Sequence, residues 1–315
     1  MNLRKYMAIV MIVAGAFGIA CSDDGGNTTD NAVDNAVVDN ATTDVAADTQ
    51  VDNSTTDVVV DTPVTTSLFE GQLVDFASKT GRKGVDVMPL DNDTGLPLDA
   101  VKYPALKSGD DGLFEMQLPA GTMVGFQATG KEEVTTGIAM KFQKTYMFNI
   151  PSDAQGKRVY AVNTITYATA PATAGIKVDK TKGILAGTIY WKNGVSGQEE
   201  FVGCASIEAI PVEGTTALGD VRYFDPANDL PGPLSKAPFT TTGLAGTSRY
   251  IIANLPVGRY KLVVKINDVQ VNTGAAEVSL FAYADSIAIS NVYLEGAANP
   301  TPARAECVVD EANPT

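Results

Sequence analysis

The sequence of 315 residues predicts an all-β protein in which two tandem Greek-key-type β-sandwich domains follow a signal peptide and a disordered acidic tether. Three observations lead to this prediction. From Leu68 onward, short apolar stretches alternate with Gly, Pro, Asn and Asp, which is typical of sandwiches built from many short strands. Apolar residues recur at every second position in 259–266 and 185–191, as in strands with one buried face. Two parts of the body also repeat one order of motifs.

The first twenty residues have the features of an export signal. Arg4 and Lys5 precede an apolar run, and Cys21 follows it. A basic start and about fifteen apolar residues indicate a secretory signal peptide over 1–20, because the run is too short to span a bilayer comfortably. The Gly-Ile-Ala-Cys ending resembles the lipobox of bacterial lipoproteins, although Gly18 stands where that family has a bulky aliphatic residue. The resemblance implies lipidation of Cys21, and the alternative is a secreted protein with a free Cys21 thiol.

Residues 21–67 are predicted to form a disordered tether. Between Ser22 and Leu68 the chain has ten aspartates, no aromatic residue and no Glu, Lys or Arg. Variants of Asp-Asn-Ala-Val and Thr-Thr-Asp-Val repeat along it, without the glycine turns and fixed register of a calcium-binding repeat. Like-charge repulsion and the lack of large apolar side chains keep such a segment from burying enough surface to fold.

The composition excludes several classes of function. The formal net charge is −14, so no extended basic surface is expected to pair with nucleic-acid phosphates. The chain has no histidine, which removes Ser-His-Asp and Cys-His catalysis and zinc sites of the His-Glu-x-x-His type. We therefore expect no metal ion or other cofactor and no catalytic residue.

The cysteine count is consistent with export. The chain has three cysteines. With Cys21 assigned to lipid, Cys204 and Cys307 remain, and two cysteines in an exported protein most simply form one disulfide. The alternative is two separate buried thiols.

The expected strands fall into two sets with the same order. Each set has a glycine-containing strand, a glycine turn, a second strand, a loop, an aromatic strand and a Leu-Pro-x-Gly turn. In the first set the motifs lie at 69–73, 84–87, 111–114 and 118–121. In the second set they lie at 185–189, 203–207, 250 and 254–260. Proline presets φ and glycine accepts positive φ, so each Leu-Pro-x-Gly predicts a tight hairpin between its two strands.

This pattern predicts the domain boundaries. The first sandwich is expected at 68–151 and the second at 182–296, with an inter-domain connector at 152–181 and a C-terminal tail at 297–315. Within the connector, apolar residues recur every third position in Val159, Val162 and Ile165, which favours a helix over 158–170.

The second set resembles the carboxypeptidase regulatory-like domain, a transthyretin-like or prealbumin-like β-sandwich. Residues 254–260 match the family's Asn-Leu-Pro-x-Gly-x-Tyr motif, and 203–204 stand where Gly-Ala is common. Residues 285–294 fit the closing strand. The first set matches less closely, since Met123 replaces the tyrosine. The resemblance implies a fold and no peptidase activity, because in metallocarboxypeptidases a separate domain with histidine ligands holds the zinc.

Two tyrosines are candidate binding residues. Trp191 shares a strand face with Leu185 and is expected in the core, whereas Tyr190 points the other way and is a candidate exposed platform for a sugar or partner. Tyr223 and Phe224 are adjacent on one strand, so one of them is expected to face outward, and Tyr223 is the second candidate. The alternative is that these are ordinary surface aromatics, which are common.

Together these features predict a non-catalytic, lipid-anchored cell-envelope protein that displays β-sandwich modules for binding, adhesion or scaffolding. The expected partners are the membrane, through the lipid, and an unidentified envelope protein or glycan. Ser22 after the cysteine resembles the sorting signal for the bacterial outer membrane, so the outer membrane or cell surface is the expected location. Two alternatives stay open: a carbohydrate-binding module with clustered exposed aromatics, and a hydrolase using two facing carboxylates about 5–10 Å apart.

Overall fold

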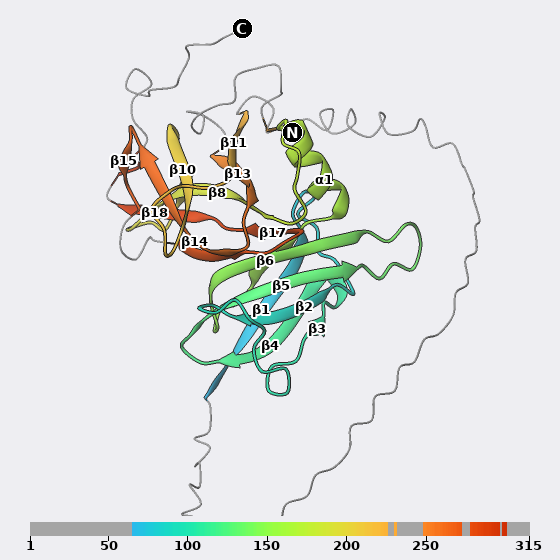
Figure 1. Ribbon diagram of the computed structural model, residues 1–315. Helices are drawn as coiled ribbons and strands as arrows, with labels where there is room; N and C mark the ends of the chain where they lie inside the picture. Colours follow the sequence, from blue (N-terminus) through green and yellow to red (C-terminus); the bar gives the residue numbers. More distant parts are fainter. Residues whose placement is uncertain (1–64, 226–229, 232–247, 273–277, 297, 301–315) are drawn as a thin grey trace, which may run out of the picture. The chain divides into compact units, whose positions relative to one another are not determined.

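The computed structural model describes residues 65–225, 230–231, 248–272, 278–296 and 298–300 (Figure 1). Over these residues the chain is almost entirely β, and the β-sandwich class expected from the sequence is confirmed. The signal sequence, Cys21, the tether up to residue 64 and Cys307 lie outside the described residues.

The first sandwich contains seven strands: β1 (Thr66–Asp75), β2 (Asp86–Asp91), β3 (Leu106–Lys107), β4 (Leu113–Pro119), β5 (Met123–Lys131), β6 (Lys141–Pro151) and β7 (Lys157–Ala161). One of its sheets has the order β4-β1-β7, and β6-β5-β2-β3 lie together in the other. The aromatic rings of Phe69, Phe114 and Phe126 pack between them, with centroids from 4.7 to 6.0 Å apart. These rings come from β1, β4 and β5, so the core ties both sheets together.

Part of the segment predicted as a connector is a strand. β7 pairs in parallel with β1, with Lys157 beside Gly71 and Ala161 beside Asp75. The helix expected from residue 158 is therefore wrong at its start: α1 (Thr164–Thr173) begins after β7, where the Asn163 side chain accepts a hydrogen bond from the Thr166 N–H and caps the first turn. The three-residue spacing that favoured a longer helix spans the end of the strand and the start of the helix.

The second sandwich contains the remaining strands: β8 (Gly183–Asn193), β9 (Glu199–Phe201), β10 (Ala205–Pro211), β11 (Asp220–Asp225), β12 (Leu230–Pro231), β13 (Arg249–Leu255), β14 (Gly258–Ile266), β15 (Val269–Gln270), β16 (Val278–Ala282), β17 (Ser286–Ile289) and β18 (Val292–Gly296). β11, β13 and β8 form one layer with β17 and β18, and β10, β14 and β16 form the other. The alternation expected in 259–266 is present, since Tyr260, Leu262 and Val264 are buried.

Both sandwiches repeat one pairing scheme. The first strand pairs antiparallel with the aromatic strand and parallel with the closing strand, namely β1 with β4 and β7, and β8 with β13 and β17–β18. The second strand pairs with the strand after Leu-Pro-x-Gly, namely β2 with β5 and β10 with β14. The motif repeat in the sequence is therefore a repeat of strand pairing.

The Leu-Pro-x-Gly turns connect the two sheets, and the hairpins expected there are absent from both sites. β4 and β5 belong to different sheets, as do β13 and β14, so each turn carries the chain across the core. In the second turn Asn254 has φ +59° and donates from its side chain to the Lys177 carbonyl and the Asp220 carboxylate. The Tyr260 hydroxyl donates to the Pro256 carbonyl at 2.8 Å. Turn residues predict a sharp reversal, but the buried faces of the strands decide which sheet the chain enters.

One short strand joins the two sandwiches. β17 lies between β8 and β6 and is parallel to both, with Ile287 beside Ile184 and Thr145 (Figure 1). One sheet therefore runs from β12 through β8, β17 and β6 to β3. The rings of Tyr146 and Tyr283 stack across this junction with centroids 4.2 Å apart. Apolar contact and shared backbone pairing leave little freedom for the sandwiches to move as separate bodies.

Gly71 and Gly187 occupy equivalent places in the two sandwiches. Each lies opposite the aromatic residue of the neighbouring strand, Gly71 beside Phe114 and Gly187 beside Tyr250. A Cβ at Gly71 would lie 2.5 Å from the Phe114 ring, and a Cβ at Gly187 would lie 1.6 Å from the Ser290 carbonyl oxygen. Glycine is required at both positions because a ring or a neighbouring backbone occupies the space of a side chain.

We predict that Gly71→Ala lowers the free energy of unfolding by about 1–3 kcal/mol through overpacking. We expect a larger loss for Gly187→Ala, because a backbone carbonyl cannot rotate away as a ring can. Gly194→Ala is the matched control, since no other group lies within 4 Å of its added Cβ. Urea denaturation of the three variants measures the losses, and a Gly187→Ala variant as stable as Gly194→Ala would contradict this account of the repeat.

Candidate functional site

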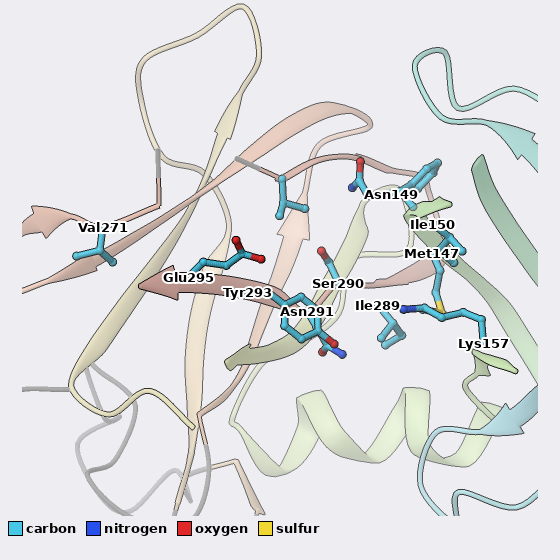
Figure 2. A pocket seen from close by; sticks show the side chains of 12 residues that line it. Met147, Asn149, Ile150, Lys157, Val271, Ile289, Ser290, Asn291, Tyr293 and Glu295 are labelled. Carbon is cyan, nitrogen blue, oxygen red and sulfur yellow. The ribbon is translucent and has the colours of Figure 1, made fainter. Parts of the chain in front are cut away.

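A groove opens where β6 and the closing strand diverge. The two strands pair only at Thr145–Ile287 and Tyr146–Ala288. Beyond that point a cavity of about 460 Å³ separates them, within the size range of ligand sites (Figure 2). Its lining comes from β6, β7, the β14–β16 region and β17–β18: Met147, Phe148, Asn149, Ile150, Lys157, Val271, Val278, Ile289, Ser290, Asn291, Tyr293 and Glu295. We call this cavity the junction groove.

The chemistry of the junction groove is mixed. Figure 2 shows Tyr293 and Glu295 on β18, Asn291 just before this strand, and Met147, Ile150 and Lys157 on the opposite side. Lys157 and Glu295 are the cation and the anion of the lining, so the groove carries no net charge. Burial raises the pKa of Tyr293 to about 12, with the Glu199 carboxylate adding to the shift, so the phenol is neutral at physiological pH. The site can offer apolar contact, hydrogen-bond donors and acceptors.

An aromatic row extends from this groove over the outer face of the second sandwich. It consists of Tyr293, Tyr190 and Phe201, which are direct cross-strand neighbours on β18, β8 and β9. Ring centroids lie 5.4 Å apart for Tyr190–Tyr293 and 5.5 Å for Tyr190–Phe201, with interplanar angles of 16° and 26°. Tyr190 thus joins a cluster on the face opposite the buried Trp191.

The geometry of the aromatic row limits what it can bind. Nearly parallel rings at these distances stack on one another, so each inner ring face is covered by its neighbour. The ring faces that the row itself leaves uncovered are the outer faces of its terminal residues, Tyr293 and Phe201. A saccharide platform needs open ring faces side by side, and the row does not provide them.

Tyr223 does not belong to an exposed surface, and that expectation is wrong. It is 4 % exposed, and its hydroxyl accepts a hydrogen bond from the Ile207 N–H at 2.8 Å. Its neighbour Phe224 packs against the core of the first sandwich. Adjacent residues on a strand face opposite sides, but both sides of β11 are covered here. Tyr223 instead links β11 in one sheet to β10 in the other.

The cysteine pairing remains a prediction, because Cys307 lies outside the described residues. Cys204 is buried and has φ +58°. Asn299, eight positions before Cys307, donates from its side chain to the Glu200 carboxylate and the Phe201 carbonyl. The start of the C-terminal tail therefore contacts β9, and β9 ends three residues before Cys204.

Asp91 and Asp93 lie together in one hollow of the described chain, but the Asp91 carboxylate accepts hydrogen bonds from the Asp93 and Thr94 N–H groups, and Asp93 forms an ion pair with Arg259. No group of three or more Cys, Asp or Glu residues there could hold a metal ion. The junction groove has one carboxylate, Glu295. A hollow near residues 131–139 has Glu132 and Glu133, but the two oxygens of Glu132 bind Arg82 and the Met140 N–H. Within residues 65–300 as described, no helix is long and apolar enough to cross a membrane.

Sequence reasoning missed Tyr293 and the junction groove. The alternation of buried Val292 and Leu294 with Tyr293 and Glu295 was available as a signal for an outward tyrosine. Its place beside Tyr190 was not, because the two tyrosines are about one hundred residues apart and meet only through parallel pairing.

No protein-family model and no curated protein sequence matches the chain. Among solved structures, a Bacillus anthracis TIE protein is 14% identical, with 73% of this chain covered and a TM-score of 0.19, and the chain spans 34% of its length. A minor pilin of Streptococcus agalactiae is 14% identical over 75% of this chain and 99% of its own, with a TM-score of 0.24. The shaft pilin SpaA of Lactobacillus rhamnosus GG is 14% identical over 74% and 99%, with a TM-score of 0.21. At such values these likenesses assign neither a family nor a role.

We predict that the free energy of unfolding falls between about pH 10 and 12. Burial raises the pKa of Tyr223 to about 12, from about 10 in an unfolded chain. The unfolded state therefore loses its proton first as the pH rises, and stability that is complete below pH 10 is lost toward pH 12. One such phenol lowers the free energy of unfolding by up to about 1.4 kcal/mol per pH unit over this range.

Urea denaturation from pH 9 to 12 measures this slope. Tyr223→Phe lacks the titrating group, so its slope should be shallower, although its stability at pH 8 should fall because Ile207 loses a partner. Tyr190→Phe is the control, since Tyr190 is partly exposed on the outer face of β8, in the aromatic row and outside the core. Equal slopes for wild type and Tyr223→Phe would contradict the buried position.

Proposed function

We propose that this chain is a non-catalytic, lipid-anchored protein of the bacterial cell envelope, in which the sandwiches present a binding surface at the end of an acidic tether. Four features of the sequence support the anchor: the basic start, the apolar run, the lipobox-like ending at Cys21 and the aspartate-rich segment after it. The absence of histidine speaks against Ser-His-Asp and Cys-His hydrolysis and against histidine-ligated zinc sites.

One observation carries the display role: β17 pairs with both β8 and β6. A shared strand holds the two sandwiches in one body, which suits a scaffold that presents fixed surfaces. Enzymes with clefts between domains commonly open and close around substrate, and a continuous sheet opposes such motion. The surface that this body presents at its junction is the groove together with the aromatic row.

The two alternatives receive less support. A carbohydrate-binding module fits the clustering of Tyr190 with other aromatics, but the stacked rings leave few open faces for sugars. A carboxylate-only hydrolase needs two facing acids, and the junction groove contains Glu295 alone. The binding and scaffolding role therefore remains the proposal.

Cys21→Ser should release the protein from membranes, because the lipid is the proposed attachment. Several acyl chains hold a mature lipoprotein firmly, whereas the body has an acidic surface with little affinity for anionic head groups. Cell fractionation and detergent partitioning measure the change, with Ser22→Ala as a control that keeps the cysteine. Membrane retention of Cys21→Ser would refute the anchor, and wild-type protein in the inner membrane would refute the outer-membrane location.

We also propose that Cys204 and Cys307 form a disulfide. The tail begins on β9 at Asn299, and eight further residues span at most about 28 Å, enough to return to Cys204. The closed loop of about one hundred residues allows up to about 4–5 kcal/mol of stabilisation by chain entropy, less whatever the tail loses by fraying. Mass mapping of the unreduced exported protein should find a peptide that joins the two. Alkylation of both thiols without reduction would reject the pairing.

A further inference from the structure

The outer edge of β18 is open in the described chain. β17 is covered on both sides, by β8 and β6, but β18 pairs with β8 alone. An uncovered strand edge is a template for another strand, and proteins usually protect such edges. The edge of β18 faces the junction groove, because Asn291, Tyr293 and Glu295 line that cavity.

The register identifies which backbone groups of β18 face the groove. The Thr188 N–H points toward β18, since it donates to the Asn291 side chain, whereas Ile189 bonds on the other side to Ser248 and Val202. Backbone groups alternate along a strand, so Tyr190 also faces β18. In a parallel pair, the N–H and C=O groups of Tyr190 form hydrogen bonds with the residues on either side of its neighbour Tyr293, namely Val292 and Leu294.

Tyr293 and Glu295 therefore turn their N–H and C=O groups away from β8 and toward the groove. Among the described residues, no hydrogen bond to these four groups is present outside the β8–β18 ladder. Polar backbone groups are strong donors and acceptors, and they are satisfied by water or by a partner. Tyr293 and Glu295 are two residues apart, which is the spacing at which an added strand would form hydrogen bonds with this edge.

Side chains on both faces of the sheet at this edge could contact the side chains of an added strand. Tyr293 ends the aromatic row on the outer face, with one ring face uncovered by the row. On the inner side, Val271 and Val278 are partly buried against the core of the second sandwich and also line the groove. Alternate side chains of an extended segment would lie on the Tyr293 ring and beside the two valines.

We propose that the junction groove binds an extended peptide segment of a partner protein, which adds to the edge of β18 as a further strand. The segment is uncharged overall, in keeping with the balanced Lys157 and Glu295, and has β-branched or apolar residues at alternate positions. It continues the strand pairing that β6 and β17 begin at Thr145 and Tyr146. This inference rests on the proposed binding role and names the class of partner.

The walls of the groove favour a single segment over a second copy of the chain. Met147 and Ile150 on β6 stand across the groove from β18, so a whole sheet arriving edge-on would meet β6. A single strand needs about 5 Å beside its neighbour, and a groove of this volume has room for a few residues of it. The exposed backbone groups also favour a peptide over a sugar, because their N–H and C=O groups can form the regular hydrogen bonds of a β-sheet with a peptide backbone.

A peptide library tests the proposal on the mature chain without its lipid, residues 21–315 with Cys21→Ser. A phage-displayed library of random peptides of about eight residues is selected on this protein, and the affinity of the selected peptides is measured by fluorescence anisotropy. We expect enrichment of sequences with alternating β-branched residues. Because the protein is unlipidated, this outcome is independent of whether the anchor proposal holds.

Glu295→Pro removes one groove-facing N–H, and proline is tolerated at such edge positions. We expect the affinity to fall about tenfold, the equivalent of about 1.4 kcal/mol. Glu295→Ala removes the same side chain and keeps the N–H, so it is the reference against which the tenfold loss of Glu295→Pro is measured. An unchanged melting temperature for Glu295→Pro confirms that the fold is intact.

Amide hydrogen exchange provides a readout that needs no variant. In the free protein the Tyr293 and Glu295 amides should exchange rapidly and the Leu294 amide slowly, and a selected peptide should slow the first two. The proposal is overturned if no sequence is enriched, if Glu295→Pro binds as well as Glu295→Ala, or if exchange at Tyr293 and Glu295 does not change. Binding of neutral oligosaccharides or dimerisation in place of peptide binding would also overturn it.

Discussion

The arrangement of this protein depends on the pairing of β17 with two strands at once. β17 closes the second sandwich by lying parallel to β8, and its other edge pairs with β6 of the first sandwich. The core around the first sandwich accordingly includes Ile184, Ile251 and Ile287 from the second. Parallel pairing over so few residues is weak in isolation, so the apolar contacts and the Tyr146–Tyr283 stack stabilise it.

A second constraint explains why the two sandwiches look alike in sequence. In each, the first strand must lie next to an aromatic strand and a closing strand, and the central glycine leaves room for both. The Leu-Pro-x-Gly turn then carries the chain to the opposite sheet. In the second sandwich the Asn254 side chain also forms hydrogen bonds with the segment before β8, donating to the Lys177 carbonyl and accepting from the Asp179 N–H. The motif residues thus determine the packing of the strands and the connection between the sheets.

The candidate site is a consequence of the same junction. The closing strand is interrupted at Ser290 and Asn291, where the Ser290 N–H donates to Ala186, the Ser290 carbonyl accepts from the Tyr250 hydroxyl and the Asn291 side chain accepts from Thr188. Before this break β17 is covered by β6, and after it β18 is not. The break therefore converts a buried strand into an open edge, and it places Tyr293 at the end of the aromatic row.

The sequence alone determined the β class, the alternation within β14, the repeat of strand motifs and the burial of Trp191, because side-chain periodicity and turn chemistry are local. The single buried face expected for residues 185–191 is wrong, because β8 is buried on both faces from Gly183 to Ile189. It did not determine that Leu-Pro-x-Gly crosses between sheets, that β7 completes the first sandwich, or that Tyr223 is covered. Each of these depends on which surface packs against which strand, and a period of two reports only that opposite faces differ. The pairing of residues 190 and 293 and the open edge of β18 depend on contacts about one hundred residues apart, which only the tertiary structure decides.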